Sequence, residues 1–159
     1  MERNLLTREG HAKLLQDLKR LRQVELPSSV KAIEEARAHG DLSENAEYHA
    51  AKERNAMIMG KINELDEVLA TAEVVAPPAD TGGRVVFGVT VTVFDTDNEE
   101  ECVYQIVGSP EADATNGRIS ITSPIGQALL GKEEGDEIRV KTPGGIRTLE
   151  VVSVSCAAN

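Results

Sequence analysis

The stretch that decides the fold of the first half of this chain is Asn55-Ala-Met-Ile58-Met-Gly-Lys-Ile62-Asn-Glu-Leu65-Asp-Glu-Val-Leu69-Ala-Thr-Ala72. Its six numbered positions are spaced 3, 4, 3, 4 and 3 residues apart, the spacing of a helix that packs against another helix in a coiled coil. Gly60 weakens the run, since Gly costs ~1 kcal/mol relative to Ala inside a helix. The stretch predicts a long helix whose apolar face needs a partner.

A second apolar stripe lies upstream and begins after Thr7, which is a suitable N-cap for a first helix. Pro27 should kink or break this helix, because proline has no N–H for the bond to residue i−4. The stripe consists of Leu14, Leu18, Leu21, Val30, Ile33 and Ala36. It supplies the partner that the first stretch needs.

Antiparallel pairing of the two stripes gives one consistent register. The residue numbers add to 83 or 84 for Leu14 with Leu69, Leu18 with Leu65, Leu21 with Ile62, Leu26 with Ile58, and Ile33 with Ala51. A constant sum indicates a single hairpin that turns near residues 41 and 42, with an arm ~40 Å long at 1.5 Å per residue. We therefore expect an antiparallel coiled coil over residues 1–76, paired within one chain, and a monomer.

The expected turn is Gly40-Asp41-Leu42-Ser43-Glu44-Asn45, which contains two carboxylates. One interpretation is an acidic capping box, with Asp41 as the N-cap and Glu44 three residues later. The other is a metal site, because two hard oxygen donors suit Mg²⁺. Two carboxylates cannot complete an octahedral site, so whatever the tip visits must supply the rest.

Other polar residues flank the tip. His39 and His49 could join the tip carboxylates in a transition-metal cluster or be exposed polar side chains, and no ligand spacing here matches a closed zinc site. Arg37, Lys52 and Arg54 either pair with glutamates on a solvated helix face or form a small basic patch for a nucleic-acid backbone. Composition does not choose between these readings.

The second half, residues 77–159, has a different period. A Pro- and Gly-rich linker at 76–83 precedes alternating apolar residues at 89–94, a pattern typical of a half-buried strand. Further strands are expected at 102–107, 118–121, 137–141 and 148–154. A short helix is expected between Ser123 as N-cap and Gly131 as stop, with Pro124 in its first turn. The fold class is α+β, with the helix packed on a small antiparallel sheet.

Composition excludes several classes of function. The net charge of −10 should repel bare DNA or RNA, and no apolar run is long enough to span a bilayer. The start of the sequence does not look like a signal peptide, and Cys102 and Cys156 form no disulfide or thiolate-metal pattern, so we expect a cytoplasmic protein. The acidic run from Asp95 to Glu101 reads as a solvated hairpin turn rather than a calcium loop.

Three motifs resemble the bacterial transcript cleavage factors of the Gre family, and together they cover nearly the whole chain in order. They are EARAHGDLSENAEYHAAKE at 35–53, IVG at 106–108 with SI and SPIGQALLGK at 120–132, and KTPGG at 141–145. The segment Leu26-Pro27-Ser28-Ser29 is less charged than expected of the family, and the basic patch is thin. Neither departure touches Asp41 or Glu44.

The resemblance implies a coiled coil followed by an FKBP-like domain that docks at the RNA polymerase secondary channel. Asp41 and Glu44 would help hold the second catalytic Mg²⁺ of the polymerase, which cleaves backtracked RNA, and Ser43 would help place the RNA end or water. Arg37 and Lys52 would contact the RNA 3′ portion. The implied docking residues are Ser123, Pro124, Ile125, Gly126, Leu129 and Gly131. The protein would have no cofactor of its own, no membrane contact and no catalytic activity without the polymerase.

Three other functions compete with this reading. An inhibitory homologue would block the same channel, although such homologues carry a more acidic tip than Asp-Leu-Ser-Glu. A prolyl isomerase would need an aromatic-lined pocket, whereas residues 77–159 contain only Phe87, Phe94 and Tyr104 as aromatics. A plain coiled-coil interaction module would need no tip chemistry at all.

Overall fold

The computed structural model describes residues 3–40 and 45–156. The chain has an α+β fold and divides into two compact units. The helical unit is His11–Thr71, and the sheet unit combines Met1–Gly10 with Ala72–Asn159. The short segments that enter and leave the helical unit therefore belong with the sheet.

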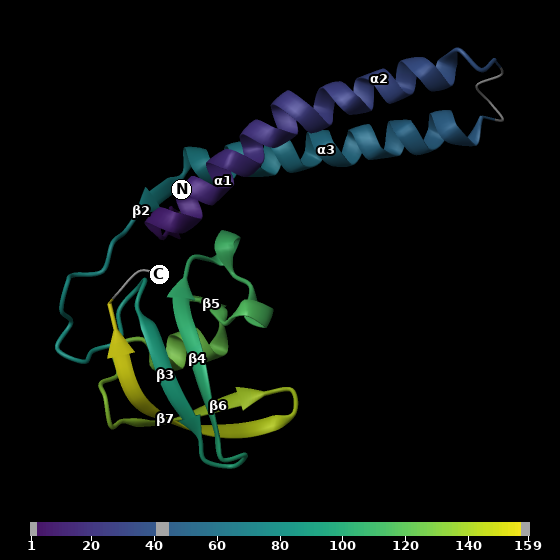
Figure 1. The fold of residues 1–159 in the computed structure, drawn as a ribbon. Coiled ribbons are helices and arrows are strands. Elements are labelled where there is room, and N and C mark those ends of the chain that lie inside the picture. Colours follow the sequence, from purple (N-terminus) through teal and green to yellow (C-terminus); the bar gives the residue numbers. More distant parts are fainter. Residues whose placement is uncertain (1–2, 41–44, 157–159) are drawn as a thin grey trace. The chain divides into compact units, whose positions relative to one another are not determined.

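The helical unit is a long hairpin, in which α2 and α3 run side by side (Figure 1). The chain passes through α1 (Arg8–Arg20), a π-helix η1 (Leu21–Glu25), α2 (Leu26–Arg37) and α3 (Ala46–Ala70). Thr7 is the N-cap of α1, because its hydroxyl accepts a bond of 3.0 Å from the Gly10 N–H. The expected N-cap is confirmed.

Pro27 does not break the helix. In a regular α-helix the carbonyl of Gln23 would lack a donor, because proline has no N–H. The π-helical segment ends just before this point, and the Leu26 N–H bonds to the Leu21 carbonyl five residues earlier. The disturbance expected from Pro27 takes the form of this widened turn, and Pro27 lies at the start of α2.

The π turn also changes which side chains fill the seam of the hairpin. Val30, expected in the apolar stripe, is 44% exposed, whereas Ser29 is fully buried. The Ser29 hydroxyl donates to the Asn55 side-chain oxygen at 3.0 Å, and these two residue numbers fit the expected register. The buried apolar residues of the seam are Leu14, Leu18, Ala36, Ile58, Ile62 and Leu65.

The sheet unit contains five strands in the order β5-β4-β3-β7-β6. Their bounds are β3 Thr90–Asp95, β4 Glu100–Val107, β5 Arg118–Ser120, β6 Glu137–Thr142 and β7 Gly145–Ser155, with α4 at Pro124–Leu129. Neighbouring strands are antiparallel except β4 and β5, which are parallel. The sheet is therefore mixed rather than antiparallel throughout, because the chain crosses over between β4 and β5 through two 3₁₀ turns, Ser109–Glu111 and Ala114–Asn116.

A second, two-stranded sheet belongs to the same unit. Strands β1 (Asn4–Leu6) and β2 (Ala72–Val74) pair in parallel, and the Val75 N–H donates to the Leu6 carbonyl at 3.0 Å. Sequence reasoning missed this pair, because each strand has three residues and too little alternation to be recognised.

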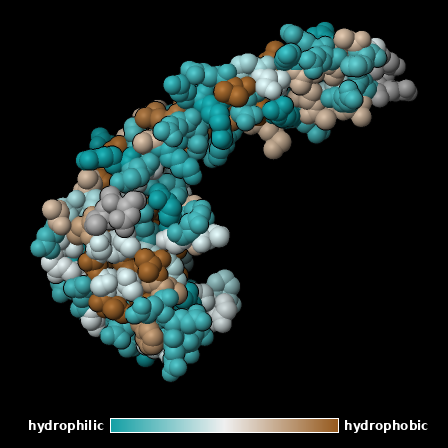
Figure 2. Space-filling model, viewed as in Figure 1, coloured by the Kyte–Doolittle hydropathy of each residue, from teal (hydrophilic) through white to brown (hydrophobic). Residues whose placement is uncertain are grey.

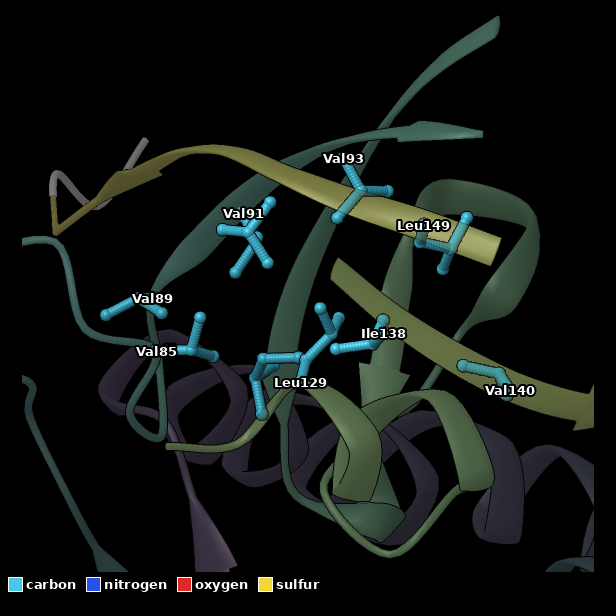
Figure 3. Packing of buried hydrophobic residues seen from close by; sticks show 10 residues of the cluster. Val85, Val89, Val91, Val93, Leu129, Ile138, Val140 and Leu149 are labelled. Carbon is cyan, nitrogen blue, oxygen red and sulfur yellow. The ribbon is translucent and has the colours of Figure 1, made fainter. Parts of the chain in front are cut away.

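The core of the sheet unit lies between α4 and the concave face of the sheet. Figure 3 shows Leu129 from α4 pointing toward the strands, close to Ile138. Alternate residues of β3, Val91 and Val93, are completely buried, which confirms the half-buried alternation expected at 89–94. The ten-residue cluster consists of Val85, Val89, Val91, Val93, Ile106, Leu129, Ile138, Val140, Leu149 and Val151.

The acidic run closes the turn between β3 and β4, as expected of a hairpin turn. Asp95 is only 1% exposed, although a solvated turn was expected. One of its carboxylate oxygens accepts the N–H groups of Asp97 and Asn98, and the other accepts the Arg147 guanidinium at 3.1 Å. The N–H of Asn98, helped by Arg147 and Asp97, lowers the pKa of Asp95 against the opposing effect of burial.

The convex face of the sheet is partly apolar, and Figure 2 shows hydrophobic groups gathered over the strands among hydrophilic ones. Val103 on β4 and Val152 on β7 are 57% and 43% exposed. Within residues 3–40 and 45–156, the helices are too short or too polar to cross a lipid bilayer.

Candidate functional site

The end of α2 is a tight turn that leads the chain out of the helix. The N–H of His39 bonds to the Ala36 carbonyl at 3.2 Å, and that of Gly40 bonds to the Arg37 carbonyl at 3.4 Å. Gly40 has φ of +108°, a conformation that side-chain-bearing residues rarely adopt. A glycine at this position is therefore what allows the helix to end here.

Asn45 fastens the start of α3 to the end of α2. Its side-chain oxygen accepts the Tyr48 N–H at 3.0 Å, so Asn45 is the N-cap of α3. Its amide nitrogen donates to the Ala36 carbonyl of α2 at 2.7 Å. One side chain thus satisfies an orphan donor of α3 and adds a second donor to a carbonyl in the last turn of α2, and it joins the two helix ends.

This capping corrects one of the two interpretations of the tip carboxylates. The capping box required Asp41 as the N-cap, but α3 begins at Ala46 and Asn45 holds the N-cap position. Asparagine is among the strongest N-cap residues, so the signal was present in the sequence. It was overlooked because the spacing from Asp41 to Glu44 also matched a capping box.

The three tip residues Asp41, Ser43 and Glu44 lie outside the described residues. The histidines that flank them, His39 and His49, are both exposed. Among the described residues, no group of three or more His, Cys, Asp or Glu side chains is placed to hold a metal ion.

The basic residues near this end are held in different ways. Arg54 pairs with Glu25 across the hairpin at 3.2 Å. The Lys52 ammonium lies 5.3 Å from the centre of the Tyr48 ring, a cation–π distance. Arg37 and Lys52 are exposed and form no ion pair with a described residue.

The expected docking segment forms the compact α4 turn of the sheet unit. The Ser123 hydroxyl accepts the Gly126 N–H at 3.0 Å and donates to the Ser120 carbonyl at 2.7 Å, which confirms Ser123 as N-cap. A Cβ on Gly126 would overlap the Ser120 carbonyl oxygen, so glycine is required there. Gly126 and Leu129 are buried and support the turn, whereas Pro124 is exposed.

The second and third sequence motifs meet at one pocket. It has a volume of about 390 Å³, and Ser123, Pro124 and Ile125 lie on one side of it. Lys141, Thr142 and Pro143 come from the turn between β6 and β7. Ser120, also from the second motif, lines the pocket too, together with Ala112, Ala114, Arg118 and Ile119, which sequence reasoning did not single out. None of these described lining residues is aromatic, which disfavours a prolyl isomerase site.

Comparisons with known proteins match both halves of the chain. The family model described as "Transcription elongation factor, N-terminal" matches residues 4–74. The model described as "Transcription elongation factor, GreA/GreB, C-term" matches residues 79–156. Together they cover both units.

Individual relatives match over almost their full length. A transcription elongation factor GreA from Hyphomonas neptunium is 56% identical over 154 residues, which cover 97% of this chain and 98% of the relative. GreA from Cereibacter sphaeroides is also 56% identical, and GreA from Brucella canis is 54% identical, with the same coverage.

Among solved structures, the GreA factor homolog Gfh1 of Thermus thermophilus is 31% identical, with a TM-score of 0.44 and coverage of 96% of this chain and 99% of that one. The two family models, and the sequence identity of 54–56% over 97% of this chain, lead to one conclusion. This chain belongs to the GreA/GreB family of transcription elongation factors.

Proposed function

We propose that this protein binds RNA polymerase in the cytoplasm, enters its secondary channel with the helical hairpin, and stimulates cleavage of backtracked RNA. The observation that carries the proposal is the match of both family models to a chain that keeps Asp41 and Glu44. The hairpin buries its apolar seam within one chain, which supports a monomer as the active form.

The tip carboxylates fit the role of a shared half-site. Asn45 supplies the N-cap of α3, so α3 does not need Asp41 for that purpose. Asp41 and Glu44 would bind Mg²⁺ together with carboxylates of the polymerase, and that metal supplies the activated water. Ser43, between them in sequence, would help place the RNA end.

The exposed cations give the tip a second contact. Arg37 and Lys52 lie at the described end of the hairpin and are free to approach an RNA backbone. With a net charge of −10, the whole protein would not bind free RNA well, so this contact would form only when the polymerase holds the RNA in place.

The docking surface would be the rim of the α4 pocket. Pro124 and Ile125 offer apolar contact beside the Lys141 cation. Gly126 and Leu129 would shape this surface from inside, and Gly131 with φ of +84° would end it.

Cleavage assays on stalled, backtracked elongation complexes test the proposal. Asp41→Ala and Glu44→Ala should each reduce stimulated cleavage by at least about tenfold, the scale on which even outer-shell partners of a metal site matter. Both variants should still bind polymerase, and both should need more Mg²⁺ to reach their maximum rate.

The matched control is Glu47→Ala, which removes an exposed carboxylate from the first turn of α3 and should leave the cleavage rate unchanged. Full stimulation by either tip variant would remove that residue from the mechanism. A wild-type protein that slowed cleavage would instead point to an inhibitory homologue.

A further inference from the structure

The start of α1 is held by the sheet unit. Residues 4–10 belong to that unit, and Leu6 is completely buried in it. A Cβ on Gly108, at the end of β4, would overlap the Leu5 carbonyl oxygen, so backbone meets backbone at this point. The strand that leads into α1 is therefore packed tightly on residues about a hundred positions later in the chain.

One side chain, Glu111, binds the first turn of α1 directly. Its carboxylate accepts the Thr7 N–H at 2.7 Å and the Thr7 hydroxyl at 2.5 Å. The same hydroxyl accepts the Gly10 N–H. Of the N–H groups at the start of the helix, that of Thr7 therefore bonds to the carboxylate directly and that of Gly10 through the hydroxyl. The positive end of the helix dipole favours a negative charge at this place.

The same carboxylate also pairs with Arg118, at the oxygen that accepts the Thr7 hydroxyl. Arg118 donates to a Glu111 carboxylate oxygen at 2.5 Å, to the Glu111 carbonyl at 3.3 Å, and to the Gln105 side chain at 3.2 Å. The Glu111 side chain is only 4% exposed. A carboxylate is rarely buried this deeply unless all of its oxygens are bonded, and here they are.

Gly10 fits this arrangement closely. A Cβ at Gly10 would overlap the Glu111 carboxylate, whereas a Cβ at Gly60 of α3 would meet nothing within 4 Å. Alanine is the better helix former at an ordinary helical position. The glycine in the first turn of α1 leaves the space in which the carboxylate reaches the helix.

We propose that Glu111 is a positioning residue for the cleavage activity: within the unit that carries the docking pocket, it fixes the first turn of α1, where the chain enters the hairpin. Helix α1 begins in the sheet unit at Arg8 and continues into the helical unit. A carboxylate that fixes this first turn orders the segment through which the chain enters the hairpin, and loss of that order is expected to slow delivery of the tip. This inference rests on the proposed function.

The test separates docking from delivery of the tip. The rate of stimulated cleavage is measured against factor concentration, at a temperature well below unfolding, to give a maximum rate and a half-saturating concentration. Glu111→Ala and Gly10→Ala should lower the maximum rate about tenfold, since misplacement of reacting groups has large kinetic effects. The half-saturating concentration should stay the same, because the pocket is untouched. Glu111→Gln keeps an acceptor for Thr7 and should fall between wild type and Glu111→Ala.

The matched control is Glu73→Ala on β2, which removes an exposed carboxylate paired with Arg3 at 3.7 Å and should change neither quantity. A physical readout complements the rates. In Glu111→Ala, hydrogen exchange at the Gly10 amide should speed up, and ¹⁵N relaxation should show a more mobile first turn of α1.

A maximum rate for Glu111→Ala equal to that of wild type would overturn the proposal. Unchanged hydrogen exchange and unchanged relaxation at the first turn of α1 would overturn it equally. If wild type does not stimulate cleavage, the proposed function fails, and the exchange and relaxation measurements still decide whether Glu111 anchors α1.

Discussion

The helical and sheet units are stabilised by cores of different kinds. The seam of the hairpin is narrow: its buried apolar residues keep 4–8% of their surface exposed, and a serine–asparagine pair lies among them. The sheet unit has a compact cluster in which Val91, Val93 and Leu129 are completely buried. A thin seam fits the proposed role of the hairpin as a slender arm, whereas a closed core fits the proposed role of the sheet unit in docking.

The test with the largest expected effect is to truncate one leucine side chain to alanine in each core. Leu129→Ala should destabilise the sheet unit by about 3–5 kcal/mol, because a completely enclosed leucine leaves a cavity. Leu18→Ala in the seam should cost less, about 2–3 kcal/mol, because solvent already reaches the site. Urea unfolding followed by probes placed in each unit measures both. Equal losses would mean that the seam is packed as tightly as the sheet.

The second test concerns the buried charge of the sheet unit. The folded pKa of Asp95 is lowered, so the stability that its charge provides is present above the unfolded pKa near 3.8 and is lost as pH falls through the folded value. The stability gap between wild type and Asp95→Asn should therefore be constant from pH 7 to about 5 and shrink in more acidic solution. Unfolding curves across pH measure it, and a gap independent of pH would assign the role to hydrogen bonding alone.

A smaller effect is expected from the polar pair in the seam. Ser29→Ala leaves the Asn55 oxygen without its donor and should destabilise the helical unit by about 1–2 kcal/mol. Circular dichroism at 222 nm during urea unfolding follows this unit best, since it holds most of the helix. Ser28→Ala, at an exposed neighbouring position of α2, is the control and should have little effect. Equal stability of the two variants would show that the pair contributes nothing.

The smallest expected effect is a gain. Gly60→Ala should stabilise the helical unit by up to about 1 kcal/mol, because the site is helical, exposed and open. Gly126→Ala in the sheet unit should destabilise instead, since its Cβ would overlap a carbonyl oxygen. Thermal melts of the two variants measure the contrast. A destabilising Gly60→Ala would indicate a local requirement for glycine in α3.

The sequence predicted the parts of the fold that depend on local periodicity. The spacing of Ile58, Ile62 and Leu65 and the constant pairing sum correctly predicted two helices in one hairpin, and the Ser29–Asn55 bond fits that register. Thr7 and Ser123 were recognisable as N-caps from residue type and position. These features could be found because the partners lie within one or two turns, or repeat regularly.

Prediction failed where one local pattern allowed two outcomes. Asp41 and Asn45 were both suitable N-caps, and only the start of α3 at Ala46 decided for Asn45. The presence of Pro27 predicted a disturbance of the helix but not its form. The π turn was therefore missed, as was the burial of Ser29 in the seam at the expense of Val30, which is exposed. The Asp95 side chain was expected to be exposed to solvent, because its partner Arg147 is 52 residues away in the sequence and no local pattern predicts the pair.

By itself, the sequence determined the two periods, the N-caps Thr7 and Ser123, the family and the two carboxylates at 41 and 44, because each of these depends on neighbouring or regularly spaced residues. Only the tertiary structure decided that β5 runs parallel to β4, that the α4 pocket unites two distant motifs, and that Glu111 holds the first turn of α1. The reason is distance along the chain. Thr7 and Glu111 are 104 residues apart, and only folding makes a buried carboxylate and the start of a helix satisfy each other.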